Sequence, residues 1–342
     1  MEQEKLVAFV IPYFGKLPNY FPVFLKSCEI NRQFDWLLFT DDHTEYDYPD
    51  NVKVSYGTFA ELKQRIEARF SFPVALPSPK KLCDFKPAYG YIFEEELKPY
   101  RYWGHCDIDL VLGDLGAFLD ETVLGSYQKH FYLGHMSIYE NSPEMRTLFM
   151  KGHPRKENET MLYGYRDVLG NPGNMVFDEW SDTVETINHV AESQGVQINP
   201  SFPMFDIRPF RSRFYSTVFD PAVHTWIHNP TDNYVVAWEN GKLWRCSLDN
   251  QTKEIKKQEI LYAHFQKRKM QWGGRDLTFP CIFFFPNQIK PCAEITEAMI
   301  RRALRLAKVR RWFRIDEIRH RLADFAALWK HRYRKHIRRT KS

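Results

Sequence analysis

The chain has 342 residues, 44% of them hydrophobic and 27% charged, and its formal net charge is +5 at pH 7. This length and composition exclude a disordered chain and a small disulfide-stapled module, because the apolar content can build a large core. The six cysteines are scattered without a C-x-x-C pair, which argues against a zinc ribbon and a disulfide framework and favours the reduced cytoplasm.

The first part of the chain alternates short apolar runs with helical patterns. Strands are predicted at residues 6–12, 34–40 and 52–56, and helices at residues 20–31 and 59–70. Thr58 precedes the second helix, and Glu61 stands three residues later as its capping-box partner. Strands that alternate with helices indicate an α/β fold with a parallel sheet covered on both faces.

The remaining elements follow in a less regular order. A helix begun or kinked near Pro87 is predicted first, then a buried strand that ends in Asp107-Ile108-Asp109. Asn240-Gly241 between two apolar runs predicts a hairpin with a type I′ turn. We further expect strands at residues 131–139 and 260–265, a mobile polar loop at 151–174 and a helical tail at 293–339.

Asp107 and Asp109 are the most informative residues of the chain. Successive strand residues point to opposite faces, so both carboxylates can meet one ion only if the strand ends or bends there. Strand ends in open α/β sheets face ligand crevices, and Mg²⁺ or Mn²⁺ binds carboxylate oxygens while bridging nucleotide phosphates. The motif therefore predicts a metal–diphosphate site. The alternative is two turn carboxylates, one of which caps a helix near residues 115–119.

The pattern Lys81-x-x-Asp84-x-Lys86, followed by Trp103-Gly104-His105-Cys106-Asp107-Ile108-Asp109, resembles the sugar-nucleotide core of GT-A glycosyltransferases. The chain also resembles, over residues 5–290, a bacterial family of glycosyltransferases found in capsule and surface-polysaccharide loci. In place of the usual Gly-Gly before the D-x-D motif, this chain has Tyr100-Arg101-Tyr102-Trp103-Gly104.

The resemblance implies a fold and two domains. A GT-A-like domain, with a Rossmann-type and mostly parallel sheet and flanking helices, is expected in residues 1–292. A basic amphipathic helical tail is expected in residues 293–342. The implied function is metal-dependent transfer of a sugar from a nucleoside diphosphate sugar, with a UDP-sugar favoured. The acceptor would be a saccharide or a lipid-linked saccharide in surface polysaccharide synthesis.

The resemblance also implies roles for residues outside the D-x-D motif. His264 would be the third ligand of a Mn²⁺ or Mg²⁺ ion held by Asp109, with Asp107 reaching the metal or the ribose. A histidine packed in a strand is the alternative for His264. The remaining donor contacts would come from Pro12, Tyr13, Phe14, Asp41, Asp42, Lys81, Asp84, Lys86 and Lys267. A solvated turn is the alternative for Asp41 and Asp42, and a solvated helix surface for Lys86.

The catalytic base is predicted in Phe177-Asp178-Glu179-Trp180, which follows a Gly-rich segment. An inverting transfer needs a carboxylate that deprotonates the acceptor hydroxyl as it attacks the anomeric carbon. Asp178 is the favoured residue and Glu179 the second choice. An acidic first turn of a helix is the alternative, and a retaining enzyme would not need this base. The stereochemistry is therefore left open.

Charge is distributed unevenly along the chain. Residues 301–342 hold sixteen Lys and Arg against three acids, a net charge of +13, and the first 300 residues have a net charge of −8. The tail would lie on an anionic membrane surface or pack on the acidic body, and no nucleic acid is expected. The N-terminus lacks a signal peptide pattern and no apolar run could span a membrane. These features predict a cytoplasmic protein, peripheral on the inner face of the cell membrane.

Two other classes of function compete with glycosyl transfer. Asp107-Ile108-Asp109-Leu110-Val111 also matches the D-x-D-x-V nucleophile motif of haloacid-dehalogenase-type phosphohydrolases. That motif normally ends the first strand of its domain, whereas here about 100 residues of α/β pattern precede it. The basic tail alternatively indicates a non-catalytic membrane or nucleic-acid adaptor, which the acidic body and the D-x-D motif make the poorer interpretation.

Overall fold

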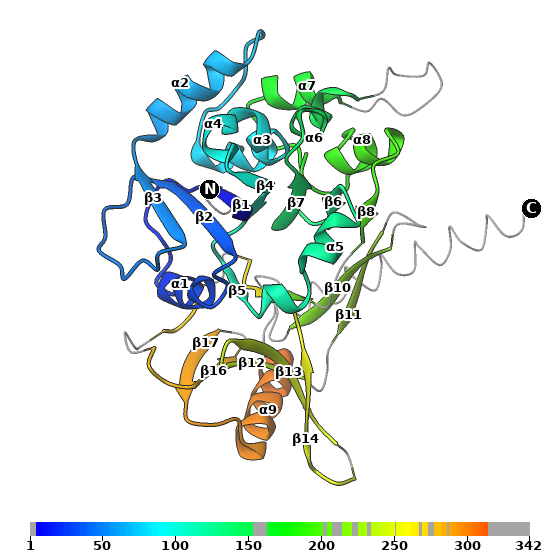
Figure 1. The fold of residues 1–342 in the computed structure, drawn as a ribbon. Coiled ribbons are helices and arrows are strands. Elements are labelled where there is room, and N and C mark those ends of the chain that lie inside the picture. The colour runs from blue at the N-terminus through cyan, green and yellow to red at the C-terminus, as the bar shows by residue number, and fades with distance from the viewer. Residues whose placement is uncertain are drawn as a thin grey trace, which may run out of the picture.

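The residues that the structure describes form three β-sheets with helices packed around them (Figure 1). The structure is a computed structural model and describes residues 5–152, 163–200, 204–206, 214–220, 225–230, 234–249, 251–266, 269–272, 277–285 and 287–313. None of the described helices is long and apolar enough to cross a membrane.

The first sheet has seven strands in the order β3-β2-β1-β4-β7-β6-β8. Its strands are β1 (Lys5–Pro12), β2 (Phe34–Thr40), β3 (Val52–Tyr56), β4 (Tyr100–Cys106), β6 (Lys129–His130), β7 (Met136–Glu140) and β8 (Ile198–Asn199). Strands β1 to β4 run parallel, and among the described strands of this sheet β7 alone runs against its neighbours. The expected α/β fold with a largely parallel sheet is therefore confirmed.

Helices cover both faces of this sheet, as the apolar runs predicted. They are α1 (Phe21–Glu29), α2 (Phe59–Arg69), α3 (Tyr89–Ile92), α4 (Glu94–Leu97), α5 (Glu121–Gly125), α6 (Pro143–Arg146), α7 (Tyr165–Gly170) and α8 (Ile187–Ser193), with 3₁₀ helices η1 (Pro79–Ala88), η2 (Leu115–Ala117) and η3 (Leu148–Met150). Alternate residues of β1 point to the two faces of the sheet. Phe9 belongs to the apolar cluster that includes Phe24 of α1, and Val10 belongs to the cluster that includes Ile66 of α2. The capping box of Thr58 and Glu61 forms at the start of α2.

The order of the strands creates a crevice between β1 and β4. The chain leaves β1, builds β2 and β3 on one side, and returns to place β4 on the other side of β1. The connections at the carboxyl ends of β1 and β4 therefore diverge, and such a switch in strand order is where open α/β sheets bind ligands. Pro12 ends β1 and Cys106 ends β4, so the D-x-D motif begins at this crevice.

Two five-stranded sheets follow. The second has the order β11-β10-β9-β15-β5, formed by β5 (Leu110–Leu112), β9 (Met204–Asp206), β10 (Tyr215–Asp220), β11 (Thr225–Pro230) and β15 (Tyr262–His264). The third has the order β14-β13-β12-β16-β17, formed by β12 (Val235–Glu239), β13 (Lys242–Leu248), β14 (Ile255–Glu259), β16 (Cys281–Phe285) and β17 (Gln288–Cys292). Asn240 and Gly241 both have positive φ, at 51° and 84°, which confirms the predicted type I′ hairpin.

The last described element is helix α9 (Glu297–Phe313), which lies beside β12 and β13 (Figure 1). Ile300 and Ala303 of this helix are buried in one apolar cluster with Val235 and Phe283 of the third sheet. The first turns of the basic tail are therefore anchored to the folded body through apolar contacts. Residues 314–342 lie outside the described part of the chain.

Three details differ from the sequence-based expectations. The strand predicted at residues 131–139 begins only at Met136, and α7 occupies part of the predicted loop at 151–174. Cys281 and Cys292 form a disulfide, so the expectation that the cysteines build no disulfide framework was wrong for this pair. The two residues face each other across the β16–β17 hairpin with Cα atoms 5.2 Å apart, a register that the spacing of the cysteines does not reveal.

Candidate metal and nucleotide site

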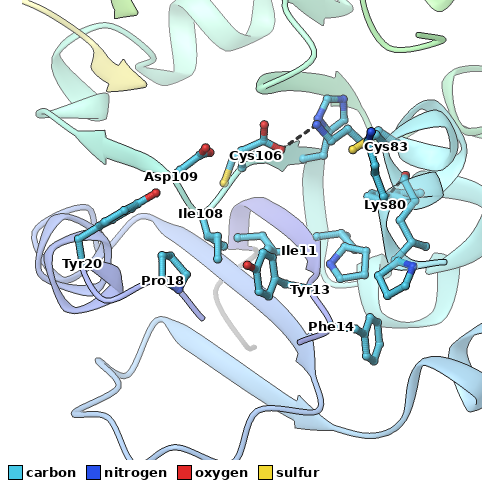
Figure 2. Close-up of a pocket in the computed structure, with 18 of the residues that line it drawn as sticks. Ile11, Tyr13, Phe14, Pro18, Tyr20, Lys80, Cys83, Cys106, Ile108 and Asp109 are labelled. Atoms are coloured by element: carbon cyan, nitrogen blue, oxygen red, sulfur yellow. Dashed lines mark hydrogen bonds and ion pairs between the residues drawn. The ribbon is translucent and has the colours of Figure 1, made fainter. Parts of the chain in front are cut away.

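A cavity of about 700 Å³ opens at the crevice between β1 and β4. Figure 2 shows Tyr20 and Asp109 at one end of this cavity and Lys80 and Cys83 at the other, with Tyr13 between them. Its wall combines the loop after β1, helix η1, the D-x-D segment and a short stretch near residue 270. The volume suits a ligand of drug or nucleotide size.

The D-x-D motif lies where the chain passes from the first sheet to the second. β4 ends at Cys106 and β5 begins at Leu110, so the expected break in the strand occurs within the motif. The Asp107 N–H donates to the carbonyl of His135 (2.9 Å), which fixes the turn. The two carboxylates lie on the same bend but differ in exposure, because Asp109 is buried and Asp107 is partly exposed.

His264 reaches this bend because β15 pairs antiparallel with β5. The register places His264 opposite Leu110, directly after Asp109, and the Phe265 N–H donates to the Asp109 carbonyl (2.8 Å). His264 Nε2 lies 3.4 Å from Asp109 Oδ1 and 4.0 Å from Asp107 Oδ2. His135 stacks on the His264 ring with centroids 4.3 Å apart, which holds the imidazole in this orientation. Asp107 and Asp109 thus converge with His264, which lies 155 positions after Asp109 in the sequence.

The donor atoms of Asp107, Asp109 and His264 fit one divalent cation. One ligand atom from each lies within 4.8 Å of the other two, a spread that a single ion can span. Two carboxylate oxygens and one imidazole nitrogen suit Mn²⁺, and Mg²⁺ accepts the same carboxylates. Three protein ligands leave coordination positions for water or phosphate oxygens, as a substrate-binding metal site requires.

Lys86 links this triad to the predicted catalytic acids. Its ammonium donates to Asp107 Oδ1 and to the Gly134 carbonyl, both at 2.8 Å, and lies 3.2 Å from Asp178 Oδ2. Burial alone would lower the pKa of Lys86, but the carboxylates of Asp107 and Asp178 hold that pKa well above its usual value. Lys86 is therefore a permanent cation that neutralises two acids. Because its side chain is buried, the alternative of a solvated helix surface was wrong.

Asp178 and Glu179 lie beside Gly134, and a Cβ added to that glycine would come within 2.4 Å of Asp178 Oδ2. Burial raises the pKa of Asp178, although the Lys86 charge opposes this. Burial, followed by the negative charge of Asp178, raises the pKa of Glu179 to about 7. The two adjacent carboxylates therefore differ: Asp178 is held by Lys86, and Glu179 titrates near neutral pH.

Helix η1 separates residues that the sequence grouped together. A 3₁₀ helix has three residues per turn, so side chains at i and i+3 align. Lys80, Cys83 and Lys86 accordingly share the face that lines the cavity. Lys81 and Asp84 share the next face, which points into the protein.

Lys81 and Asp84 form a buried ion pair and not a part of the cavity wall. Their side chains are 0% and 1% exposed, and Lys81 Nζ lies 2.8 Å from Asp84 Oδ2. The same ammonium donates to the carbonyls of Val168 and Gly173, and Asp84 accepts N–H groups from Met175 and Phe177. The predicted contacts of Lys81 and Asp84 with the donor were therefore wrong, because both side chains bind the segment that leads to Asp178.

The loop after β1 divides in a similar way. Pro12, Tyr13 and Phe14 line the cavity, as the predicted nucleotide contacts require. Asp41 accepts the N–H of Gly15 (2.7 Å) and Asp42 accepts the N–H of Leu17 (2.8 Å), so these carboxylates brace the loop from behind. Neither Asp41 nor Asp42 is among the described residues that form the cavity wall.

Several wall residues were missed by sequence reasoning, and one predicted residue lies outside the described part of the chain. Lys267 is that residue, whereas Lys269 of the same basic run lines the cavity and is exposed. Lys80, exposed on η1, and Tyr20, at the start of α1, also line the wall. In the sequence, Lys80 stands in a pair of lysines and Lys269 in a basic run. Only the folded backbone shows that these two residues line the cavity.

No curated protein matches this chain. One family profile matches residues 9–291, a range that contains the cavity, the Asp107–Asp109–His264 triad and the three sheets except the start of β1 and the last residue of β17, and that ends before α9. On that match, the chain belongs to the DUF6625 family, which is described as a family of unknown function.

Proposed function

We propose that this protein is a metal-dependent glycosyltransferase with a GT-A-like fold. The observation that carries the proposal is the convergence of Asp107, Asp109 and His264 on one cation position at the edge of a nucleotide-sized cavity, at the strand-order switch of a largely parallel sheet. The donor is a nucleoside diphosphate sugar, with a UDP-sugar favoured. The acceptor is a saccharide or lipid-linked saccharide in surface polysaccharide synthesis at the cytoplasmic side of the membrane.

The cavity wall offers separate surfaces for the parts of such a donor. Tyr13 and Phe14 supply aromatic surface for the base and ribose. Lys80 of η1 and Lys269, which follows β15, are exposed wall residues whose ammonium groups can neutralise diphosphate oxygens. These lysines take the role that the sequence had given to Lys81 and Lys267.

Asp107, Asp109 and His264 would hold the cation, with Mn²⁺ favoured because an imidazole nitrogen suits a transition metal better than Mg²⁺. When bound, the cation supplies positive charge that screens the departing diphosphate. Lys86 would keep Asp107 oriented toward the cation, because Asp107 Oδ1 accepts a hydrogen bond from the Lys86 ammonium at 2.8 Å.

Acceptor activation is assigned to Glu179 and positioning to Asp178. A general base must be free to take a proton near the working pH. Asp178 Oδ2 is 3.2 Å from the Lys86 ammonium and the side chain is almost fully buried, so it serves the ion pair. Glu179 is less buried, and its pKa of about 7 suits proton transfer at neutral pH. This assignment reverses the order of preference that the sequence alone suggested.

The proposal is tested by identifying the phosphate product. Purified protein is incubated with UDP-, GDP- or dTDP-sugars, Mn²⁺ and a mixture of saccharide acceptors, and both nucleoside diphosphate and inorganic phosphate are measured. We expect one donor class to release nucleoside diphosphate only when metal is present. Asp109→Asn should reduce that release by at least about a hundredfold, while the exposed-site control Asp50→Asn should retain it.

Two outcomes contradict this proposal. In a parallel incubation with a simple phosphate ester, release of inorganic phosphate that is lost in Asp107→Asn would support the phosphohydrolase alternative. Equal release by wild type and Asp109→Asn would mean that the triad takes no part in the reaction.

A further inference from the structure

Helix α9 has two faces with different chemistry. The inner face is apolar and covered: Ile300 is fully buried and Ala303 nearly so, in the cluster with Val235 and Phe283 of the third sheet. Met299 and Leu304 pack against the edge of the same cluster. This half of the helix is committed to the protein and fixes the direction of the other face.

The outer face mixes exposed aliphatic and basic side chains. Leu306 and Val309 are 39% and 53% exposed, and both belong to the few large hydrophobic residues that are exposed in the described part of the chain. Arg302 and Arg305 are exposed on the same side, because positions 302, 305, 306 and 309 repeat at intervals of three and four. A rigid stripe therefore offers aliphatic groups flanked by guanidinium groups.

Positive charge is concentrated in the last part of the sequence. Residues 301–342 carry a net charge of +13, and the first 300 residues carry −8. The acidic body does not cover the described part of the helix, since α9 docks through apolar residues onto the third sheet. An anionic surface outside the protein would therefore attract the exposed Arg302 and Arg305 of this helix.

We propose that the outer face of α9 docks on an anionic phospholipid membrane. Guanidinium groups pair with lipid phosphates, and Leu306 and Val309 enter the boundary between headgroups and acyl chains. A nucleic acid would use the positive charge but gives no apolar medium for the two aliphatic side chains. The inference does not depend on glycosyl transfer, because docking requires neither a metal nor a sugar nucleotide.

The test is partitioning of the full-length protein onto sedimented vesicles without nucleotide or added metal. Vesicles of phosphatidylcholine alone are compared with vesicles that also contain phosphatidylglycerol. We expect binding to the anionic vesicles only. The variant Leu306→Glu/Val309→Glu should partition at least about tenfold more weakly.

A matched control keeps the change in charge and moves it to another surface. Tyr56→Glu/Lys63→Ser also makes the net charge more negative by two, at exposed positions of β3 and α2. It should partition within about twofold of wild type. Circular dichroism shows whether each variant retains its fold, and nucleoside diphosphate release without vesicles reports separately on the proposed reaction.

Two results would overturn the inference. One is that wild type does not partition onto anionic vesicles. The other is that the Leu306→Glu/Val309→Glu variant binds them as well as wild type, which would show that tail charge acts alone. Binding of a single-stranded oligonucleotide by a wild type that does not bind anionic vesicles would indicate nucleic acid as the partner instead.

Discussion

Lys86 is the residue on which both halves of the candidate site depend. Its ammonium lies 2.8 Å from Asp107 of the D-x-D motif and 3.2 Å from Asp178 of the predicted catalytic segment. A buried charge is tolerated when it is paired, and here one cation neutralises two acids that would otherwise repel each other. The Gly134 carbonyl accepts a further hydrogen bond from this ammonium, which fixes the direction of the Lys86 side chain.

Glu179 leads to a prediction about pH. Burial and the neighbouring Asp178 raise its pKa to about 7, so the carboxylate is protonated, and unable to act as a base, at lower pH. We expect kcat/KM for transfer to rise about tenfold per pH unit below this pKa and to level off above it. Glu179→Gln should remove this pH dependence and reduce the rate by about 10²–10⁴-fold.

The matched control for that profile is Asp178→Asn. It removes one of the two carboxylates that pair with Lys86 but leaves the Glu179 carboxyl, so the rising limb should persist, shifted to lower pH because one negative neighbour of Glu179 is gone. A rising limb that survives unchanged in Glu179→Gln would show that another group accepts the proton.

Among the elements, helix η1 has one face that lines the cavity and one face that is buried in the protein. Lys80 is exposed on the cavity face, whereas Lys81 is fully buried beside Asp84. Lys81→Met should lower the free energy of unfolding by about 3–5 kcal/mol, since it leaves a buried carboxylate unpaired. Lys80→Met should leave unfolding unchanged and weaken nucleotide binding instead.

Urea unfolding and nucleotide titration of the two variants provide this comparison. The adjacent lysines are matched in size and charge, so only the face on which each lies differs. Equal loss of stability in both variants would contradict the alignment of residues at i and i+3 along η1.

Elements with strong local signals were predicted from the sequence. Thr58 and Glu61 form their capping box, and Asn240-Gly241 form their type I′ turn, because each motif satisfies its own backbone within a few residues. The division of η1 was not predictable in the same way. Lys81 and Asp84 were grouped with Lys86 as donor contacts, since the sequence pattern does not distinguish a 3₁₀ helix from an α-helix.

At the scale of the whole molecule, the site is assembled by the passage of the chain between sheets. β4 belongs to the first sheet and β5 to the second, and the D-x-D motif occupies the connection between them. The pairing of β5 with β15 then brings His264 to Asp109 from a distant part of the sequence. One β-strand pairing thus completes the triad.

This long-range assembly marks the limit of reasoning from sequence. The D-x-D motif predicted a carboxylate pair at a strand end, because the physics of that position is local. His264 was expected from a resemblance alone, since no local pattern encodes its register with Leu110. Lys269 was overlooked beside Lys267, and the Cys281–Cys292 disulfide was missed, for the same reason: each depends on which strands become neighbours.

The central claim is that the triad binds a metal together with a sugar nucleotide. The most direct measurement is calorimetric titration of UDP-, GDP- and dTDP-sugars into wild type, Asp109→Ala and His264→Ala, each with and without Mn²⁺. We expect wild type to bind one nucleotide class only in the presence of Mn²⁺, and both variants to lose this binding while their folds persist. Binding that ignores Mn²⁺ or survives in both variants, or no binding of any donor by folded wild type with Mn²⁺ present, would contradict it.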